Sequence, residues 1–187
     1  MKDDVEKSVP RAVRLRLCEW RDEDLAAFAD LNADPRMAEH LPKTLTRTES
    51  DQFVSRICAH FEKHGFGLWA VEVSDVASFI GFVGLSVPRF DAHFTPCSEI
   101  GWRIAHSYWN RGYATEGARA AVTYAFSELG LSEIVSFTVP HNLASRRVME
   151  KLKMSHDPSD DFDHPMLSEG DPLRRHVLCR LKNRPSP

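Results

Sequence analysis

The sequence predicts an α+β fold, a mixed α/β sandwich formed by a single domain over residues 1–187. Stretches that alternate apolar and polar residues are interspersed with longer stretches whose apolar residues recur at helical spacing. Three of the strand-like stretches follow one another directly, which indicates a meander. A helix of about fifteen residues then separates two strands, which implies a right-handed parallel crossover. The sheet should therefore contain strand pairs of both kinds.

The first half of the chain is expected to contain a strand, two amphipathic helices and the meander. In chain order these are a strand over Ala12–Leu17, helices over Arg21–Leu31 and Thr46–His64, and strands over Leu68–Val73, Phe79–Val87 and Ser98–Ile104. We expect Thr48 or Ser50 to cap the second helix and Gly65 to end it.

The second half is expected to contain the crossover helix, a buried strand, a last helix and a final strand. In chain order these are a helix that begins at Ala114 and ends before Gly130, a strand over Ile134–Val139, a helix over Leu143–Met154, an irregular acidic stretch over Asp157–Gly170 and a strand over Arg175–Leu181. We expect an ordered core from about residue 11 to 182, with a frayed leader before it and disorder from Lys182 onward.

Composition excludes several classes of function. The formal net charge of −3 argues against a nucleic-acid-binding module driven by overall basic charge. No run of 18 apolar residues is present, so no membrane span is expected, and the first residues lack the apolar core of a signal peptide. The four cysteines, Cys18, Cys58, Cys97 and Cys179, do not have redox or metal-ligand spacing. We therefore expect reduced thiols, a cytoplasmic location and no metal site.

The turn before the long helix combines one glycine with small residues. The first turn of a helix carries unpaired N–H groups and the positive end of the helix dipole. Gly112 lets the backbone adopt a positive φ and approach a ligand, and Ala114 and Thr115 keep side chains from blocking the amides. The turn therefore suits a phosphate or pyrophosphate, with Arg111 as an accessory charge, although a tight turn alone also accounts for Gly112.

A second helix start lies about thirty residues further along the chain. There Asn142 is the expected N-cap, and Ser145 points its hydroxyl back toward the helix N-terminus. Two helix starts that follow adjacent parallel strands converge at one crevice, where open α/β sheets bind ligands. The sequence contains no G-x-x-x-x-G-K-[ST], and no G-x-G-x-x-G follows the first strand. Main-chain atoms would therefore hold most of the anion.

These segments together resemble the GNAT acetyltransferase superfamily, and most closely the branch of the RimJ/RimL ribosomal-protein N-terminal acetyltransferases. The likeness covers Leu15 to Leu181 and is carried by E-I-G-W-R-I (Glu99–Ile104), Y-W-N-R-G-Y-A-T-E-G (Tyr108–Gly117), A-F-S-E-L-G-L (Ala125–Leu131) and V-P-H-N-L-A-S-R-R-V-M-E-K-L (Val139–Leu152). Two departures are Trp109, where the superfamily has Gln or Arg, and Lys153, where a glycine is usual. The resemblance implies a strongly twisted mixed sheet with helices on both faces and two splayed central strands.

The resemblance also implies acetyl-CoA as co-substrate. Its pantetheine arm would run between the strand that ends at Ile104 and the strand Ile134–Val139, with Asn142 on the arm and Ser145 near the sulfur. Its pyrophosphate would rest on the main-chain amides of Asn110, Arg111, Gly112, Tyr113, Ala114 and Thr115. N–H donors for the oxyanion would come from Trp102, Arg103 and Ile104.

The expected reaction is direct attack of an amine on the thioester, without a covalent enzyme intermediate. Met149 occupies the position of the family's usual general-acid tyrosine, so Ser145 is the candidate acid for the leaving thiolate. Glu99 is the candidate base that removes the proton of the ammonium group, with His141 as an alternative and His164 as a residue of the acceptor pocket.

The acceptor stays open at this point. It could be a peptide N-terminal α-amine, a polyamine, an amino acid or an aminoglycoside, and the acidic stretch Asp157–Asp163 would suit a polycation. A noncatalytic acyl-CoA-binding sensor is the alternative function, suggested by the missing tyrosine. The protein is expected to act as a monomer or homodimer.

Overall fold

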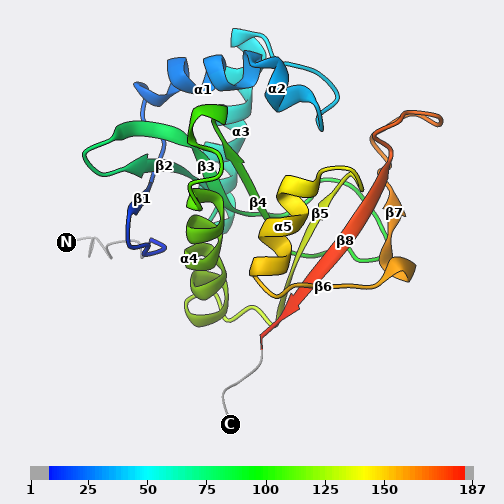
Figure 1. The fold of residues 1–187 in the computed structure, drawn as a ribbon. Coiled ribbons are helices and arrows are strands. Elements are labelled where there is room, and N and C mark those ends of the chain that lie inside the picture. Colours follow the sequence, from blue (N-terminus) through cyan, green and yellow to red (C-terminus); the bar gives the residue numbers. More distant parts are fainter. Residues whose placement is uncertain (1–8, 184–187) are drawn as a thin grey trace.

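A computed structural model describes residues 9–183 and contains one mixed sheet with helices on both faces (Figure 1). The elements are β1 (Leu15–Cys18), α1 (Asp24–Ala33), α2 (Pro35–Ala38), α3 (Arg47–His64), β2 (Leu68–Val73), β3 (Ala77–Ser86), β4 (Glu99–Ile104), the 3-10 turn η1 (His106–Tyr108), α4 (Tyr113–Ser127), β5 (Glu133–Thr138), α5 (Leu143–Lys151), β6 (Ser155–His156), η2 (Pro158–Asp160), β7 (Phe162–Asp163) and β8 (Arg175–Lys182). The α+β fold class predicted from the sequence is confirmed.

The sheet has the strand order β1-β2-β3-β4-β5-β8-β6, and β7 pairs with β8 beside it. The strands from β1 to β4 form an antiparallel meander, β5 runs parallel to β4, and β8 returns antiparallel to β5. The parallel pair β4–β5 contains the single register pair Glu99↔Val135. The two strands therefore diverge after this point, as expected for splayed central strands.

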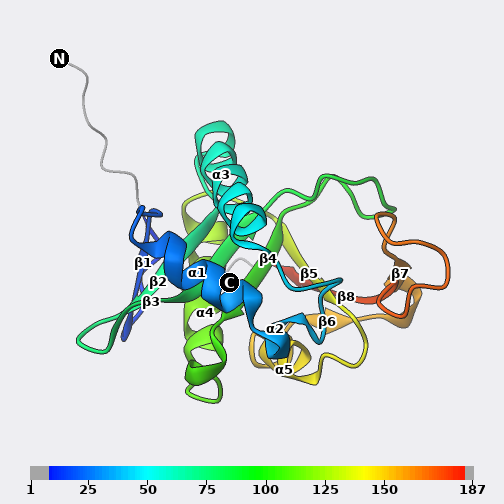
Figure 2. The same ribbon diagram turned by 90° about the horizontal axis from the view of Figure 1, so that it is seen from above.

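Helices cover the two faces of the sheet unequally. The main core packs α4 and α5 against one face and includes Ile100, Ile104, Ala121 and Met149. On the other face, Phe28 of α1 packs with residues of α3 and β3. Figure 2, viewed from above, shows α3 and α4 on opposite sides of the strands. Within residues 9–183 no helix is both long enough and apolar enough to cross a membrane.

Several N-terminal boundaries differ from the prediction. The first strand begins at Leu15 instead of Ala12, and Val13 is 96% exposed, so the alternating pattern overestimates the strand. The second helix is capped by Thr46, not by Thr48 or Ser50. Thr46 accepts from the Glu49 N–H while the Glu49 side chain accepts from the Thr46 N–H, a capping box that satisfies two orphan donors. Gly65 ends the helix in the left-handed region, as predicted.

The C-terminal part also differs in detail. The last helix ends at Lys151, three residues before the predicted Met154, and Lys153 lies in the left-handed region with φ 61°. The stretch expected to be irregular contains η2 and β7. Lys182, expected to be disordered, pairs with Glu133 at the end of β8. Most of the expected leader, residues 1–8, and residues 184–187 lie outside the described part of the chain.

Candidate active site

The turn before α4 leaves several main-chain N–H groups free. Gly112 is the N-cap residue with φ 82°, in the left-handed region that a glycine adopts without strain, and it offers no side-chain cap. The first intrahelical bond runs from the Glu116 N–H to the Gly112 carbonyl at 3.0 Å. The N–H groups of the preceding helical residues therefore lack carbonyl partners within the helix. The expected positive φ at Gly112 is confirmed, and Asn110 also has a positive φ of 59°.

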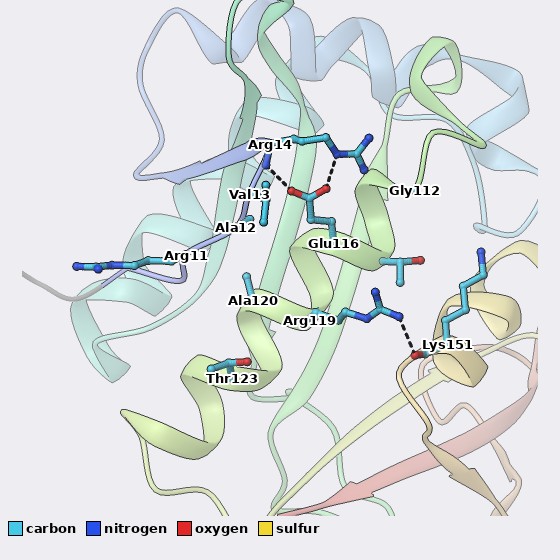
Figure 3. Close-up of a pocket in the computed structure, with 11 residues that line it drawn as sticks. Arg11, Ala12, Val13, Arg14, Gly112, Glu116, Arg119, Ala120, Thr123 and Lys151 are labelled. Carbon is cyan, nitrogen blue, oxygen red and sulfur yellow. Dashed lines mark hydrogen bonds and ion pairs between the residues drawn. The ribbon is translucent and has the colours of Figure 1, made fainter.

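A basic pocket lies along the exposed side of the same helix (Figure 3). Its lining residues are Arg11, Ala12, Val13, Arg14, Gly112, Thr115, Glu116, Arg119, Ala120, Thr123 and Lys151. Glu116 is the acid of the pocket, and its carboxylate is paired with Arg14, at 2.7 Å between Nε and Oε2. Arg119 donates to the Lys151 carbonyl and so joins α4 to α5. The cations of Arg11, Arg119 and Lys151 therefore leave the pocket positively charged.

The role of these cations was not predicted from the sequence. A signal was present, because Thr115, Arg119 and Thr123 recur every four residues and so share one helix face that begins at the glycine turn. Lys151 belongs to a different helix, and only the packing of α5 beside α4 brings it to the pocket.

The ladder between β3 and β4 determines which N–H groups face the gap beside β4. The Ala105 N–H donates to the Ile80 carbonyl at 2.8 Å, and the register pairs Arg103 with Phe82. Because N–H groups alternate in direction along an antiparallel strand, that of Arg103 points to β3, whereas those of Trp102 and Ile104 point away from β3. Since β5 has diverged there, Trp102 and Ile104 offer unpaired donors toward the gap. The prediction that Arg103 donates its backbone N–H there is therefore wrong.

Glu99 lies at the point where β4 and β5 still pair. The Ser86 hydroxyl donates to its carboxylate at 3.3 Å. Burial raises the pKa of Glu99 to about 7, with the Ser86 hydrogen bond acting in the opposite direction. A carboxylate with this pKa is suited to accept a proton near neutral pH.

Asn142 and Ser145 lie together at the start of α5, as predicted. The Asn142 side chain accepts from the Ser145 N–H at 3.1 Å and donates to the Thr138 hydroxyl at 3.0 Å, so it fixes α5 to the end of β5. Ser145 is half-buried, and its own hydroxyl bonds to no residue between 9 and 183. Met149, one turn further along, is buried in the main core, and its thioether has no acidic proton to donate.

The two histidines proposed from the sequence lie in different surroundings. His141 is exposed beside Asn142, and its ring lies 5.1 Å from that of His40, whose buried Nδ1 has no hydrogen-bond partner among residues 9–183. His164 belongs instead to an aromatic cluster, with its ring 4.6 Å from Phe90 and 5.1 Å from His176. Burial, with a smaller contribution from His176, lowers the pKa of His164.

The described residues contain no group of three or more side chains placed to hold a metal ion. His60 and His64 do have the H-x-x-x-H spacing of a metal-ligand pair on α3, and their rings stack at 4.4 Å. Both nitrogens of His60 are occupied, because Nδ1 lies 2.8 Å from the Phe66 carbonyl and Nε2 accepts from the Val87 N–H. This histidine therefore joins α3 to the segment that directly follows β3.

Comparison with known proteins identifies the family. The chain matches the acetyltransferase (GNAT) domain over residues 14–155. The chain belongs to the GNAT acetyltransferase family.

Individual proteins are also similar to this chain in sequence or in fold. The chain is 32% identical over 148 residues to the protein YkkB of Bacillus subtilis (strain 168), which covers 79% of this chain and 84% of YkkB. It is 40% identical over 96 residues to the FsC-acetyl coenzyme A-N(2)-transacetylase of Aspergillus fumigatus, covering 49% of this chain and only 40% of that protein. The fold is similar to that of Mycobacterium smegmatis RimJ in complex with CoA-disulfide, with a TM-score of 0.69 and 20% identity over 90% of this chain and 80% of RimJ.

Membership of the GNAT family makes the chain an acetyltransferase, and the resemblance to the GNAT superfamily found in the sequence is confirmed. The sensor alternative is thereby disfavoured.

Proposed function

We propose that this GNAT enzyme transfers the acetyl group of acetyl-CoA to a primary amine by direct attack in a ternary complex. The unpaired N–H groups of Trp102 and Ile104 at the edge of β4 are the observation that carries the proposal. Donors fixed in a strand edge are already oriented, so they stabilise an oxyanion without reorganisation.

Acetyl-CoA supplies the acetyl group as a thioester. The main-chain amides from Asn110 to Thr115 would hold its pyrophosphate. Arg119 and Lys151 form no ion pair within residues 9–183, so their cations favour the remaining phosphate charge beside them. Asn142 would orient the arm at the start of α5.

Two side chains would move protons. Glu99 would take the proton of the attacking ammonium, because its pKa of about 7 leaves a large fraction ionised at neutral pH. Ser145 would donate to the leaving thiolate, and its hydroxyl is not held by another described residue. His141 is a second candidate base beside Asn142.

The acceptor would be a protein N-terminal α-amine or a small-molecule amine. The four cysteines are free thiols, which supports a cytoplasmic enzyme.

Thiol release from acetyl-CoA, measured with a panel of primary amines, tests the proposal. We expect acceptor-dependent release and calorimetric binding of CoA that weakens with added salt, since phosphate charges are bound. Binding of CoA without release on any amine would contradict the transferase. Absence of CoA binding would contradict the whole site.

A further inference from the structure

Arg103 carries a partly buried positive charge on the face of β4 opposite α4. Its Nη1 donates to Asn32 Oδ1 at 2.5 Å, and its Cζ lies 5.4 Å from the Phe53 ring centroid and 5.5 Å from that of Phe82. Asn32 is only 3% exposed and donates in turn to the Ser50 hydroxyl at 2.9 Å. Neutral groups from α1, α3 and β3 therefore fix the guanidinium in place.

No carboxylate of residues 9–183 lies within 4.0 Å of Arg103, whereas Arg14, Arg36 and Arg180 each pair with an acid. Burial alone lowers the pKa of Arg103 to about 10, so the group stays protonated at neutral pH. Even a partly buried charge is costly without a counter-ion. Within residues 9–183 the protein therefore maintains an unneutralised cation on β4 itself.

The space between Arg103 and Glu99 is open. Both side chains lie on the same face of β4, four residues and roughly 13 Å apart along the strand. Gly101 lies between them on that face, and a Cβ added there would meet no atom within 4 Å. Among the described residues the only buried side-chain nitrogens without partners are in His40 and Arg174, so the unbonded nitrogens of Arg103 reach solvent. A ligand that lies over Gly101 can therefore contact the side chains of both Arg103 and Glu99.

We propose that Arg103 binds a carboxylate of the acceptor, so that the enzyme acetylates primary amines that carry a carboxylate several bonds from the amine. This inference rests on the proposed function, with the amine placed at Glu99. The planar guanidinium matches a carboxylate in two parallel hydrogen bonds. The same cation repels the second ammonium group of a diamine, which argues against polyamine acceptors. The acidic stretch Asp157–Asp163, which would suit a polycation, lies elsewhere on the chain.

A length-matched acceptor series tests this. Linear ω-amino acids with three to eight carbons are each compared with the alkylamine and the diamine of the same length, using thiol release from acetyl-CoA. For the best length, we expect kcat/KM to be higher for the amino acid by roughly tenfold or more, mainly through KM, because hydrogen bonds to charged groups are the stronger class.

Two variants should remove this preference. Arg103→Gln deletes the cation. Asn32→Asp leaves the cation but supplies an internal carboxylate at the site of the present 2.5 Å contact, so the folded protein itself occupies the guanidinium. Arg56→Gln is the matched control, because Arg56 also lies over the Phe53 ring, at 5.5 Å, but is exposed. It should keep the wild-type ratio.

The outcomes separate the two proposals. Equal use of amines and amino acids, or a preference that survives both Arg103→Gln and Asn32→Asp, would overturn the carboxylate site while leaving the transferase intact. Calorimetry of the CoA-loaded protein gives the second readout. Amino-acid binding that depends on Arg103 without thiol release would support the carboxylate site and overturn the transferase. Absence of both binding and release would overturn both.

Discussion

Replacement of Glu99 by Gln tests two proposals together, that Glu99 is the base and that burial raises the pKa of its carboxyl group. Gln keeps the shape of Glu and can still accept from the Ser86 hydroxyl, which lies 3.3 Å away. It cannot accept a proton from the ammonium. We expect kcat/KM to fall by about 10²- to 10⁴-fold, the usual contribution of a positioned general base. In the wild type, kcat/KM should rise with pH and level off above about 7, where Glu99 is ionised.

The same substitution should stabilise the protein at high pH. Burial raises the pKa of Glu99 from 4.5 to about 7, so the folded state binds the proton more tightly than the unfolded chain. The stability contributed by this residue is therefore highest below pH 4.5 and falls as the pH rises to 7. At 1.36 kcal/mol per pH unit, the interval of 7 − 4.5 corresponds to an upper limit of about 3 kcal/mol. Glu99→Gln should gain this amount at pH 8 and almost nothing at pH 4.5.

Denaturant unfolding at several pH values, combined with pH–rate profiles, checks both effects. Glu128→Gln, at the exposed C-terminal end of α4, is the control and should change neither. If Glu99→Gln kept full activity at pH 7, Glu99 would not be the base. If its gain in unfolding free energy did not depend on pH, the carboxyl would not be buried in the way that raises its pKa.

Three further substitutions test the cofactor side. Gly112→Val, at φ 82°, should raise the KM for acetyl-CoA in steady-state assays. The control Gly130→Val is also strained, at φ 64° near the other end of α4, and should leave this KM unchanged. Equal effects of the two substitutions on KM would mean that the amides of the turn do not bind the pyrophosphate. Ser145→Ala should lower kcat with little change in KM for acetyl-CoA, and an unchanged kcat would remove Ser145 as the acid. Asn142→Ala loses the cap of α5 and the bond to Thr138, so thermal unfolding should show a loss of about 1 kcal/mol, and an unchanged Tm would contradict the capping role.

The sequence predicts an element well when its apolar residues alternate or recur at helical spacing and no neighbouring residue could take the same role. Leu68–Val73 matches β2 at both ends, because its burial follows directly from its composition. The cap of α3 shows the opposite case. Thr46, Thr48 and Ser50 are all chemically able to cap, yet only Thr46 has a glutamate three residues later. Ser50 is unavailable because Asn32, a residue 18 positions earlier, uses its hydroxyl.

The residues of the candidate site also fall into two groups, those predicted from local sequence and those placed by tertiary packing. Gly112 and the cap at Asn142 are local features of single turns, and both were predicted. The direction of the Arg103 backbone N–H depends on its register against β3, which no single-strand pattern contains. Lys151 reaches the basic pocket only through helix packing. Tertiary placement of this kind requires the structure.

The register of β4 connects the hydrophobic core to the chemistry. Ile100 is fully buried and Ile104 is 5% exposed, so the core fixes which face of β4 turns toward α4. A slip by one residue would turn both isoleucines out of the main core, at about 2 kcal/mol or more each, and would turn Glu99 and Arg103 toward that apolar core. The same alternation leaves Trp102 with a free N–H at the strand edge. Core packing therefore places the proposed oxyanion donor at the strand edge and the proposed base and the guanidinium on the face opposite α4, so the proposed sites for cofactor and acceptor lie on different sides of the gap.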